Sequence, residues 1–168
     1  MKRLMLLALV ASFTLVATLT ALAEAVETIR CNKDRVCIGT NNAEIIFGNT
    51  EKAYQNIKAR AGDDRVYAQT NANTFVKGGD GGDQIFGKDG YLKAHGNLGN
   101  DTIYGTRRGD AINPGPGQDT VYAGGGNDNA DLRDGERDRI ECAGGSWDTV
   151  RADAEDAAVG CTRVYVEK

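Results

Sequence analysis

The chain has 168 residues, a length that corresponds to one domain. It contains 22 glycines, 2 prolines and 1 histidine, and much of its 40% apolar content lies in the first 23 residues. The remainder would build a thin core, which metals, disulfides or repetition usually supplement. Residues 78–156 hold 8 basic and 16 acidic side chains, a net charge of −8 that argues against a nucleic-acid partner and favours cations.

Residues 1–25 are predicted to be a cleaved signal peptide. A basic start at Lys2 and Arg3 precedes a long apolar stretch, and cleavage after Ala23 or Ala25 fits the small-residue rule for such signals. An uncleaved anchor is the alternative, since the stretch is long enough to span a bilayer, but no basic stop-transfer cluster follows it directly. We therefore expect a secreted, extracellular chain with no membrane span in its mature part.

The four cysteines are expected to form disulfides, because a secreted chain meets an oxidising environment. Cys31 and Cys37 lie near the mature start, and Cys142 and Cys161 lie near the end. Of the three possible pairings we favour the local one, Cys31–Cys37 and Cys142–Cys161. A zinc site is the alternative, although the separation of the two pairs along an elongated fold argues against it.

A pattern of about nine residues recurs between the cysteine pairs: a polar or acidic residue, any residue, then an apolar residue. The apolar positions, spaced 9 to 11 residues apart, are Ile46, Ile57, Val66, Phe75, Ile85, Ala94, Ile103, Ile112, Val121, Ala130, Ile140 and Val150. The positions two residues earlier, nine of them carboxylates, are Glu44, Gln55, Asp64, Asn73, Asp83, Leu92, Asp101, Asp110, Asp119, Asp128, Asp138 and Asp148. Such a regular period is the signature of a solenoid.

Each unit is interpreted as a six-residue turn followed by a three-residue strand with one inward apolar side chain. Two units would make one turn of about 18 residues, and stacked turns would form two parallel sheets around a narrow apolar column. We expect this roll over residues 44–152. An N-terminal cap at 26–43 and a C-terminal cap at 153–168 would close its ends, where the cysteine pairs lie.

The units resemble the haemolysin-type, or RTX, calcium-binding repeat G-G-x-G-x-D-x-U-x, in which U is large and apolar. GGDGGDQIF at 78–86 meets the full pattern, and GNLGNDTIY at 96–104 and AGGGNDNAD at 123–131 come close. The resemblance implies an all-β, right-handed parallel β-roll with Ca²⁺ between successive turns on the same edge. We do not extend lysis or proteolysis from that family to this chain, because the repeats follow the predicted signal peptide directly and no HExxH or GxSxG motif occurs. We therefore expect no enzyme activity.

In that family, Asp carboxylates and backbone carbonyls of the glycine-rich turns supply the oxygen ligands that Ca²⁺ requires. The carboxylate pairs we favour as sites are Asp83–Asp101, Asp101–Asp119 and Asp110–Asp128. Less favoured, because their spacing is 19 or 20, are Asp64–Asp83, Asp119–Asp138 and Asp128–Asp148. The resemblance also implies carbonyl ligands at Gly78, Asp80, Gly96, Leu98 and Gly105. The alternative for each carboxylate is an ordinary turn aspartate that caps its own backbone.

Aromatic residues follow the inward residue on one sheet, at Phe47, Tyr67, Phe86, Tyr104 and Tyr122. Strand alternation sends them outward, so stacked turns would build an aromatic ladder. We expect the ladder to stabilise the sheet, and a flat face for a glycan or cell-surface partner is the alternative. The leading function is thus a calcium-dependent structural or binding module, ahead of an adhesin or carbohydrate-binding module with structural calcium. A hydrolase is disfavoured by the single histidine and the lack of a nucleophile motif.

Overall fold

The computed structural model describes residues 26–32, 36–51, 54–69, 73–145 and 147–167. The predicted signal peptide, residues 1–25, lies outside these ranges. Within them the regular structure consists of β-strands, and there is no helix of the length and hydropathy that a membrane span needs.

The strands form two parallel sheets, and consecutive strands alternate between them. Sheet A consists of β1 (Glu27–Arg30), β3 (Glu44–Phe47), β5 (Arg65–Tyr67), β7 (Gln84–Phe86), β9 (Thr102–Thr106), β11 (Thr120–Gly124), β13 (Arg139–Cys142) and β15 (Ala157–Val159). Sheet B consists of β2 (Val36–Ile38), β4 (Tyr54–Ala61), β6 (Asn73–Asp80), β8 (Leu92–Leu98), β10 (Ala111–Asn113), β12 (Asn129–Asp131), β14 (Thr149–Ala152) and β16 (Arg163–Val166).

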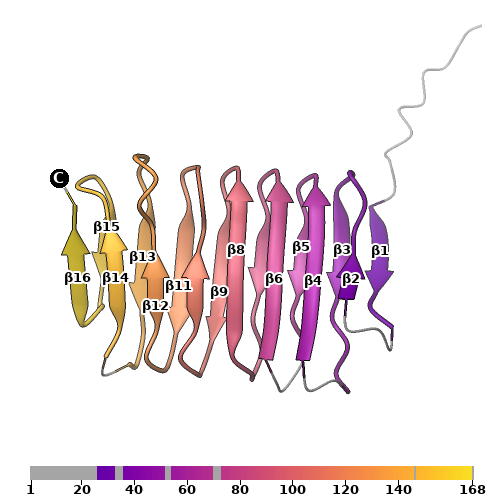
Figure 1. The fold of residues 1–168 in the computed structure, drawn as a ribbon, viewed down its shortest axis with the longest axis horizontal. Helices are drawn as coiled ribbons and strands as arrows, with labels where there is room; N and C mark the ends of the chain where they lie inside the picture. The colour runs from indigo at the N-terminus through magenta and orange to yellow at the C-terminus, as the bar shows by residue number, and fades with distance from the viewer. Residues whose placement is uncertain (1–25, 33–35, 52–53, 70–72, 146, 168) are drawn as a thin grey trace, which may run out of the picture.

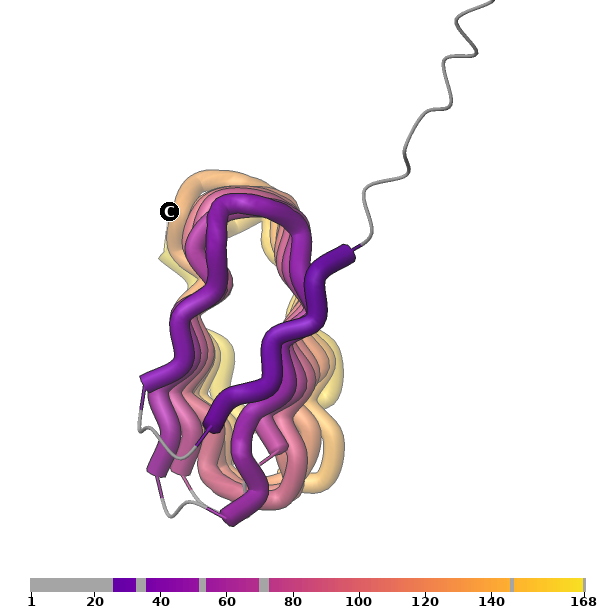
Figure 2. Tube along the Cα trace, turned by 90° about the vertical axis from the view of Figure 1, so that its right-hand side faces the viewer, coloured from indigo at the N-terminus to yellow at the C-terminus, as the bar shows by residue number. Residues whose placement is uncertain are grey.

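The chain coils as a solenoid because each strand pairs with the strand two places along the sequence. Paired residues in the middle of the roll are 18 positions apart, as in Thr102–Thr120 and Ala111–Asn129. The turns stack along the long axis of the molecule (Figure 1), and seen along that axis the two sheets form the walls of a flattened tube (Figure 2). The predicted all-β, two-sheet parallel roll is confirmed.

The core is a column of one inward apolar side chain per strand between the two sheets. Eleven of the twelve predicted inward residues are at most 3% exposed: Ile46, Ile57, Val66, Ile85, Ala94, Ile103, Ile112, Val121, Ala130, Ile140 and Val150. The next inward position, two residues later, holds in most turns a small residue such as Ala59 or Ala123, or a glycine such as Gly78 or Gly96.

The prediction that Phe75 points inward is wrong. Val76 is fully buried and pairs with Ile57, whereas Phe75 lies on the outer face of sheet B, half-buried. The residue that exceeds the nine-residue period falls before β6, so the polar column passes through buried Thr74 and not through exposed Asn73.

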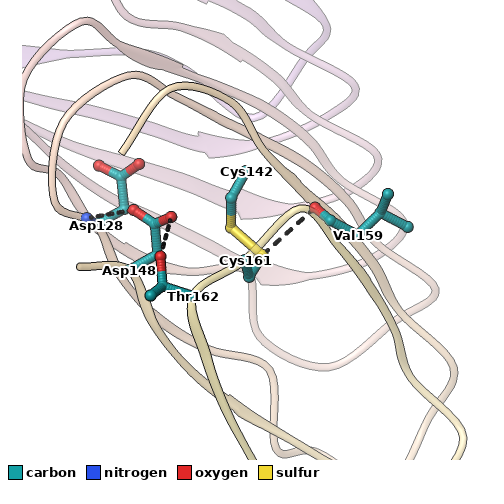
Figure 3. Close-up of a disulfide and its surroundings, with 6 residues drawn as sticks. All are labelled: Asp128, Cys142, Asp148, Val159, Cys161 and Thr162. Carbon is teal, nitrogen blue, oxygen red and sulfur yellow. Dashed lines mark hydrogen bonds between the residues drawn. A yellow bond between two sulfur atoms is a disulfide. The ribbon is translucent and has the colours of Figure 1, made fainter. Parts of the chain in front are cut away.

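Both predicted disulfides are confirmed, and they lie near the two ends of the roll. Cys31–Cys37 joins the end of β1 to β2, and Cys142–Cys161 joins β13 to the turn before β16 (Figure 3). All four cysteines are therefore paired, which leaves no thiolate for the zinc alternative. The strands β1 and β2 lie in the segment predicted as the N-terminal cap, and β15 and β16 lie in the segment predicted as the C-terminal cap; both pairs extend the two sheets.

Candidate cation site at the carboxylate ladder

A column of buried, mostly polar side chains lies at the start of the strands of each sheet. In sheet A the column consists of Glu44, Asp64, Asp83, Asp101, Asp119 and Asp138, each at most 2% exposed. In sheet B it consists of Gln55, Thr74, Leu92, Asp110, Asp128 and Asp148, each at most 3% exposed. The strands of the two sheets run in opposite directions, so the two columns lie at opposite edges of the roll (Figure 1).

The aspartates of the sheet A column form a hydrogen-bonded ladder. Each carboxylate Oδ1 accepts a hydrogen bond from the backbone N–H of the corresponding residue one turn earlier, as Asp101 does from Asp83 at 2.7 Å and Asp119 does from Asp101 at 2.6 Å. This carboxylate ladder comprises Asp64, Asp83, Asp101, Asp119, Asp138 and Asp156, with N–H to Oδ1 distances of 2.6–2.9 Å. Successive turns are thus joined by hydrogen bonds to side chains in addition to those between backbone groups.

The second carboxylate oxygen of most ladder residues has no hydrogen-bond partner among the described residues. These buried Oδ2 atoms belong to Asp64, Asp83, Asp101, Asp119 and Asp138. A buried carboxylate oxygen left unpaired costs on the order of 1–3 kcal/mol or more. Such an oxygen calls for either a proton or a cation beside it.

Burial also raises the pKa of these carboxyl groups. The pKa of Asp83 rises to about 7 and that of Asp101 to about 8, chiefly because burial disfavours the charged form. The backbone N–H that each carboxylate accepts opposes the rise, and the neighbouring ladder carboxylates reinforce it. A cation held between the turns would also offset the cost of burying these charged carboxylates. The ladder positions therefore have a high affinity for protons, and when deprotonated they carry the negative charge that attracts a cation.

Two glycines allow the free oxygens to approach the backbone closely. A Cβ atom on Gly78 would lie 2.1 Å from Oδ2 of Asp83 and 2.8 Å from the carbonyl oxygen of Gly96. A Cβ atom on Gly96 would lie 2.0 Å from Oδ2 of Asp101 and 2.4 Å from the carbonyl oxygen of Pro114. At both places a carboxylate oxygen and a carbonyl oxygen of the next turn converge on a glycine, where a larger residue would clash with them. We call these two places the glycine sites.

Most carboxylate oxygens of the column at the edge of sheet B already accept hydrogen bonds from the protein. Oδ2 of Asp110 accepts a hydrogen bond from the Thr106 N–H at 2.6 Å, and Oδ1 accepts one from the Thr106 hydroxyl at 3.1 Å. The Thr162 hydroxyl lies 3.4 Å from Oδ2 of Asp148 (Figure 3). In the described part of this column, Asp128 alone has a buried oxygen without a partner. The sheet A edge is therefore the better candidate for a cation.

The remaining carbonyl positions implied by the resemblance differ in their surroundings. The carbonyl oxygens of Asp80 and Leu98 accept backbone N–H groups of the preceding turn at 2.8 and 2.7 Å, as part of the pairing between turns. Gly105 lies where a Cβ atom would be 2.0 Å from the Ala123 carbonyl oxygen and 2.9 Å from Oδ2 of Asp110. It resembles Gly78 and Gly96 in position, but the carboxylate beside it already has protein partners.

The predicted aromatic ladder runs along the outer face of sheet A. Neighbouring rings of Phe47, Tyr67, Phe86, Tyr104 and Tyr122 stack with centroids 4.8–5.0 Å apart and planes within 10° of each other. The rings cover one another's faces and turn their edges to solvent, and the Arg30 guanidinium lies 4.9 Å from the centroid of Phe47. A sugar platform needs free ring faces, so this geometry favours a role in stabilising the sheet.

Two further carboxylates lie at the candidate site, although they are not among the ligands predicted from the sequence. Asp156 continues the ladder by accepting the Asp138 N–H at 2.9 Å, and its 18-residue distance from Asp138 was the available signal. Asp134, in the loop between β12 and β13, lies with Asp119 and Asp138 so that one oxygen from each falls within 4.8 Å of the others. The nine-residue pattern carries no signal for Asp134.

The chain matches no protein-family model, no curated protein and no solved structure.

Proposed function

We propose that the protein is a calcium-binding β-roll of the RTX type, which acts outside the cell as a structural or binding module. The observation that carries the proposal is the pair of glycine sites. At each of them, a buried carboxylate oxygen without a protein partner and a backbone carbonyl oxygen of the next turn converge against a glycine, which has no side chain to keep them apart.

The donor atoms at the glycine sites suit calcium better than other common cations. Ca²⁺ takes 6–8 oxygen ligands in flexible geometry, and both carboxylates and backbone carbonyls are among its usual ligands. Mg²⁺ demands a near-ideal octahedron and keeps several waters, which a narrow site between two turns does not favour. The donors are oxygens, and the sulfur atoms of the chain are committed to disulfides or belong to methionine.

Calcium binding at these sites would be coupled to folding. The donors come from successive turns, so the unfolded chain does not hold them together, and an ion that binds only the folded state stabilises it by mass action. The bound ion would supply the positive charge that the ladder lacks. The two disulfides agree with an oxidising, extracellular environment, where the predicted signal peptide would deliver the chain.

The test is thermal melting and far-UV circular dichroism of the disulfide-bonded protein in EDTA, followed by titration with CaCl₂ and, separately, MgCl₂. We expect calcium to raise the melting temperature and magnesium to raise it much less. Asp101→Asn removes one ladder charge and should reduce the calcium effect, whereas Asp89→Asn, at an exposed aspartate outside the ladder, should leave it unchanged. A melting temperature that is the same in EDTA and in saturating calcium would refute the proposal.

A further inference from the structure

We propose that Asp119, Asp134 and Asp138 form a second kind of cation site, outside the repeat pattern, that takes a hard divalent cation such as Ca²⁺. The proposal deepens the proposed function, because Asp119 and Asp138 also belong to the carboxylate ladder. It does not require the glycine sites to bind an ion, since Asp134 supplies the ligand that the repeat lacks here.

The three carboxylates converge from two connecting segments, since Asp134 and Asp138 share the one between β12 and β13. Asp119 precedes β11, Asp138 precedes β13, and Asp134 comes from the loop that connects β12 to β13. One oxygen atom from each lies within 4.8 Å of the others, close enough for a single ion to touch all three.

A second observation points independently to a ligand at this place. Asp119 is 2% exposed and Asp138 is 1% exposed, yet the Oδ2 atom of each is buried with no hydrogen-bond partner in the described structure. Their Oδ1 atoms are already engaged, since that of Asp138 accepts the Asp119 N–H at 2.8 Å and that of Asp119 accepts the Asp101 N–H at 2.6 Å. The free Oδ2 atoms are the ones left for a cation.

Asp134 is held in place by hydrogen bonds to the adjacent turns. Its Oδ1 accepts the Glu136 N–H at 2.7 Å and its Oδ2 accepts the Gly117 N–H at 3.2 Å. The backbone N–H of Asp134 donates to Asp153 at 2.8 Å, and the Asp153 N–H donates in turn to Asp156 at 2.7 Å. The loop is thus anchored to the ladder, and the third carboxylate is preorganised.

No basic side chain neutralises the three carboxylates by an ion pair within the described ranges. The ion pairs found there join Arg133 to Asp131 and Glu167, and Arg139 to Glu141. Three carboxylates with oxygens within 4.8 Å of one another and no positive partner repel one another, and a divalent cation is the counterion that removes the repulsion.

The site also differs from the glycine sites in what the repeat provides. The positions that correspond to Gly96 in the next two turns are Pro114 and Leu132, each 18 residues further along, and both carry side chains. The close approach of a carboxylate to a glycine is therefore not repeated in these turns. Asp134, which is only partly buried, approaches from the solvent side, where water can complete the coordination of Ca²⁺.

The experiment is isothermal titration of the calcium-free, disulfide-bonded protein with CaCl₂, in four forms: wild type, Asp134→Asn, Glu136→Gln and Asp83→Asn. Glu136→Gln is the matched control, because it removes one negative charge from an exposed residue of the same loop. Asp83→Asn removes a carboxylate from a glycine site. Circular dichroism shows whether each variant keeps the fold, and Asp134→Glu, which moves the carboxylate without changing the charge, takes the place of Asp134→Asn if the latter does not.

We expect Asp134→Asn to bind one ion fewer than wild type, and Glu136→Gln to bind the wild-type number. Asp83→Asn should keep the ion that Asp134→Asn loses. If Asp83→Asn binds calcium as wild type does while Asp134→Asn has lost an ion, calcium does not bind at the glycine sites, and binding at Asp119, Asp134 and Asp138 is supported. If Asp134→Asn binds as many ions as tightly as wild type, or if wild type binds none, the present inference is wrong.

Discussion

The carboxylate of Asp101 and the backbone of Asp83 are joined by a hydrogen bond of 2.7 Å that crosses from one turn of the solenoid to the next. The Asp83 N–H donates to Oδ1, while Oδ2 of the same Asp101 carboxylate is buried without a partner in the described structure. One oxygen therefore holds the turns together, and the other remains for a proton or a cation. The two roles can be separated by mutation.

Asp101→Ala and Asp101→Asn should differ in stability when calcium is removed. Alanine deletes the acceptor and leaves the Asp83 N–H buried and unpaired, which should lower the free energy of unfolding by about 1–3 kcal/mol. Asparagine keeps an oxygen for that N–H and removes a buried charge, so its loss should be smaller. Urea denaturation in EDTA measures both values, and equal stability of the two variants would mean that the hydrogen bond contributes nothing.

The calcium-free protein should lose stability as the pH rises from about 4 to about 8. Burial raises the pKa of Asp83 to about 7 and that of Asp101 to about 8 from the ordinary value of 3.8. At pH values between the pKa of the unfolded state and that of the folded state, the folded state binds more protons than the unfolded state. A rise in pH over this range therefore lowers the free energy of unfolding. The contribution of these carboxyl groups to stability is fully present below their pKa in the unfolded state, and it is lost as the pH rises through their pKa in the folded state.

Urea denaturation at a series of pH values in EDTA checks this direction, and calcium should flatten the curve because the ion replaces the proton. Calcium affinity should likewise increase with pH over the same range. Stability in EDTA that increases steadily from pH 4 to pH 8 would contradict the buried, uncompensated ladder.

Gly96→Ala should impair calcium binding because its methyl group would enter a glycine site. The new Cβ atom would lie 2.0 Å from Oδ2 of Asp101 and 2.4 Å from the Pro114 carbonyl oxygen, so these ligands would have to move apart. Mutation of residues that position metal ligands typically weakens metal affinity by roughly 10–100-fold, and we expect a loss of this order here. Gly125→Ala is the matched control, since its nearest atom would be 3.6 Å away, an ordinary contact. Calcium titration of both variants should show a loss for Gly96→Ala alone.

Tyr104→Ala should destabilise the protein more than Tyr122→Ala. The two side chains are equally exposed, at 38% and 37%, but Tyr104 stacks on both Phe86 and Tyr122, whereas Tyr122 stacks on Tyr104 alone. The additional stacked pair is worth about 0.5–1.5 kcal/mol. Thermal or urea denaturation measures the difference. Tyrosine variants of equal stability that abolish binding to a glycan would instead support the carbohydrate-binding alternative.

The sequence period predicts the fold well because one inward residue per strand leaves little freedom in how the chain can coil. It fails at Phe75, where two apolar residues are adjacent and the period alone does not show on which side of the strand the additional residue lies. Counting nine residues from Val66 selects Phe75, whereas the structure places the additional residue before β6 and buries Val76.

The chemistry of the site is less accessible from sequence. The pattern indicates which carboxylates share an edge, but not that one oxygen of each would accept a backbone N–H while the other stays unpaired. That division depends on the distance between turns, which the hydrogen bonds of the sheets determine. Asp134 lies in a loop that departs from the repeat, so its approach to Asp119 and Asp138 becomes visible only in three dimensions.

The most direct test of calcium binding is an anomalous difference map from crystals grown in CaCl₂, with data collected at long wavelength. We predict peaks at the edge of sheet A, between the turns that carry Asp83 and Asp101, about 2.3–2.6 Å from their Oδ2 atoms. Peaks confined to exposed carboxylates such as Asp89, with the ladder oxygens still without a ligand, would contradict the account and leave a roll held together by its core, its disulfides and its aromatic ladder.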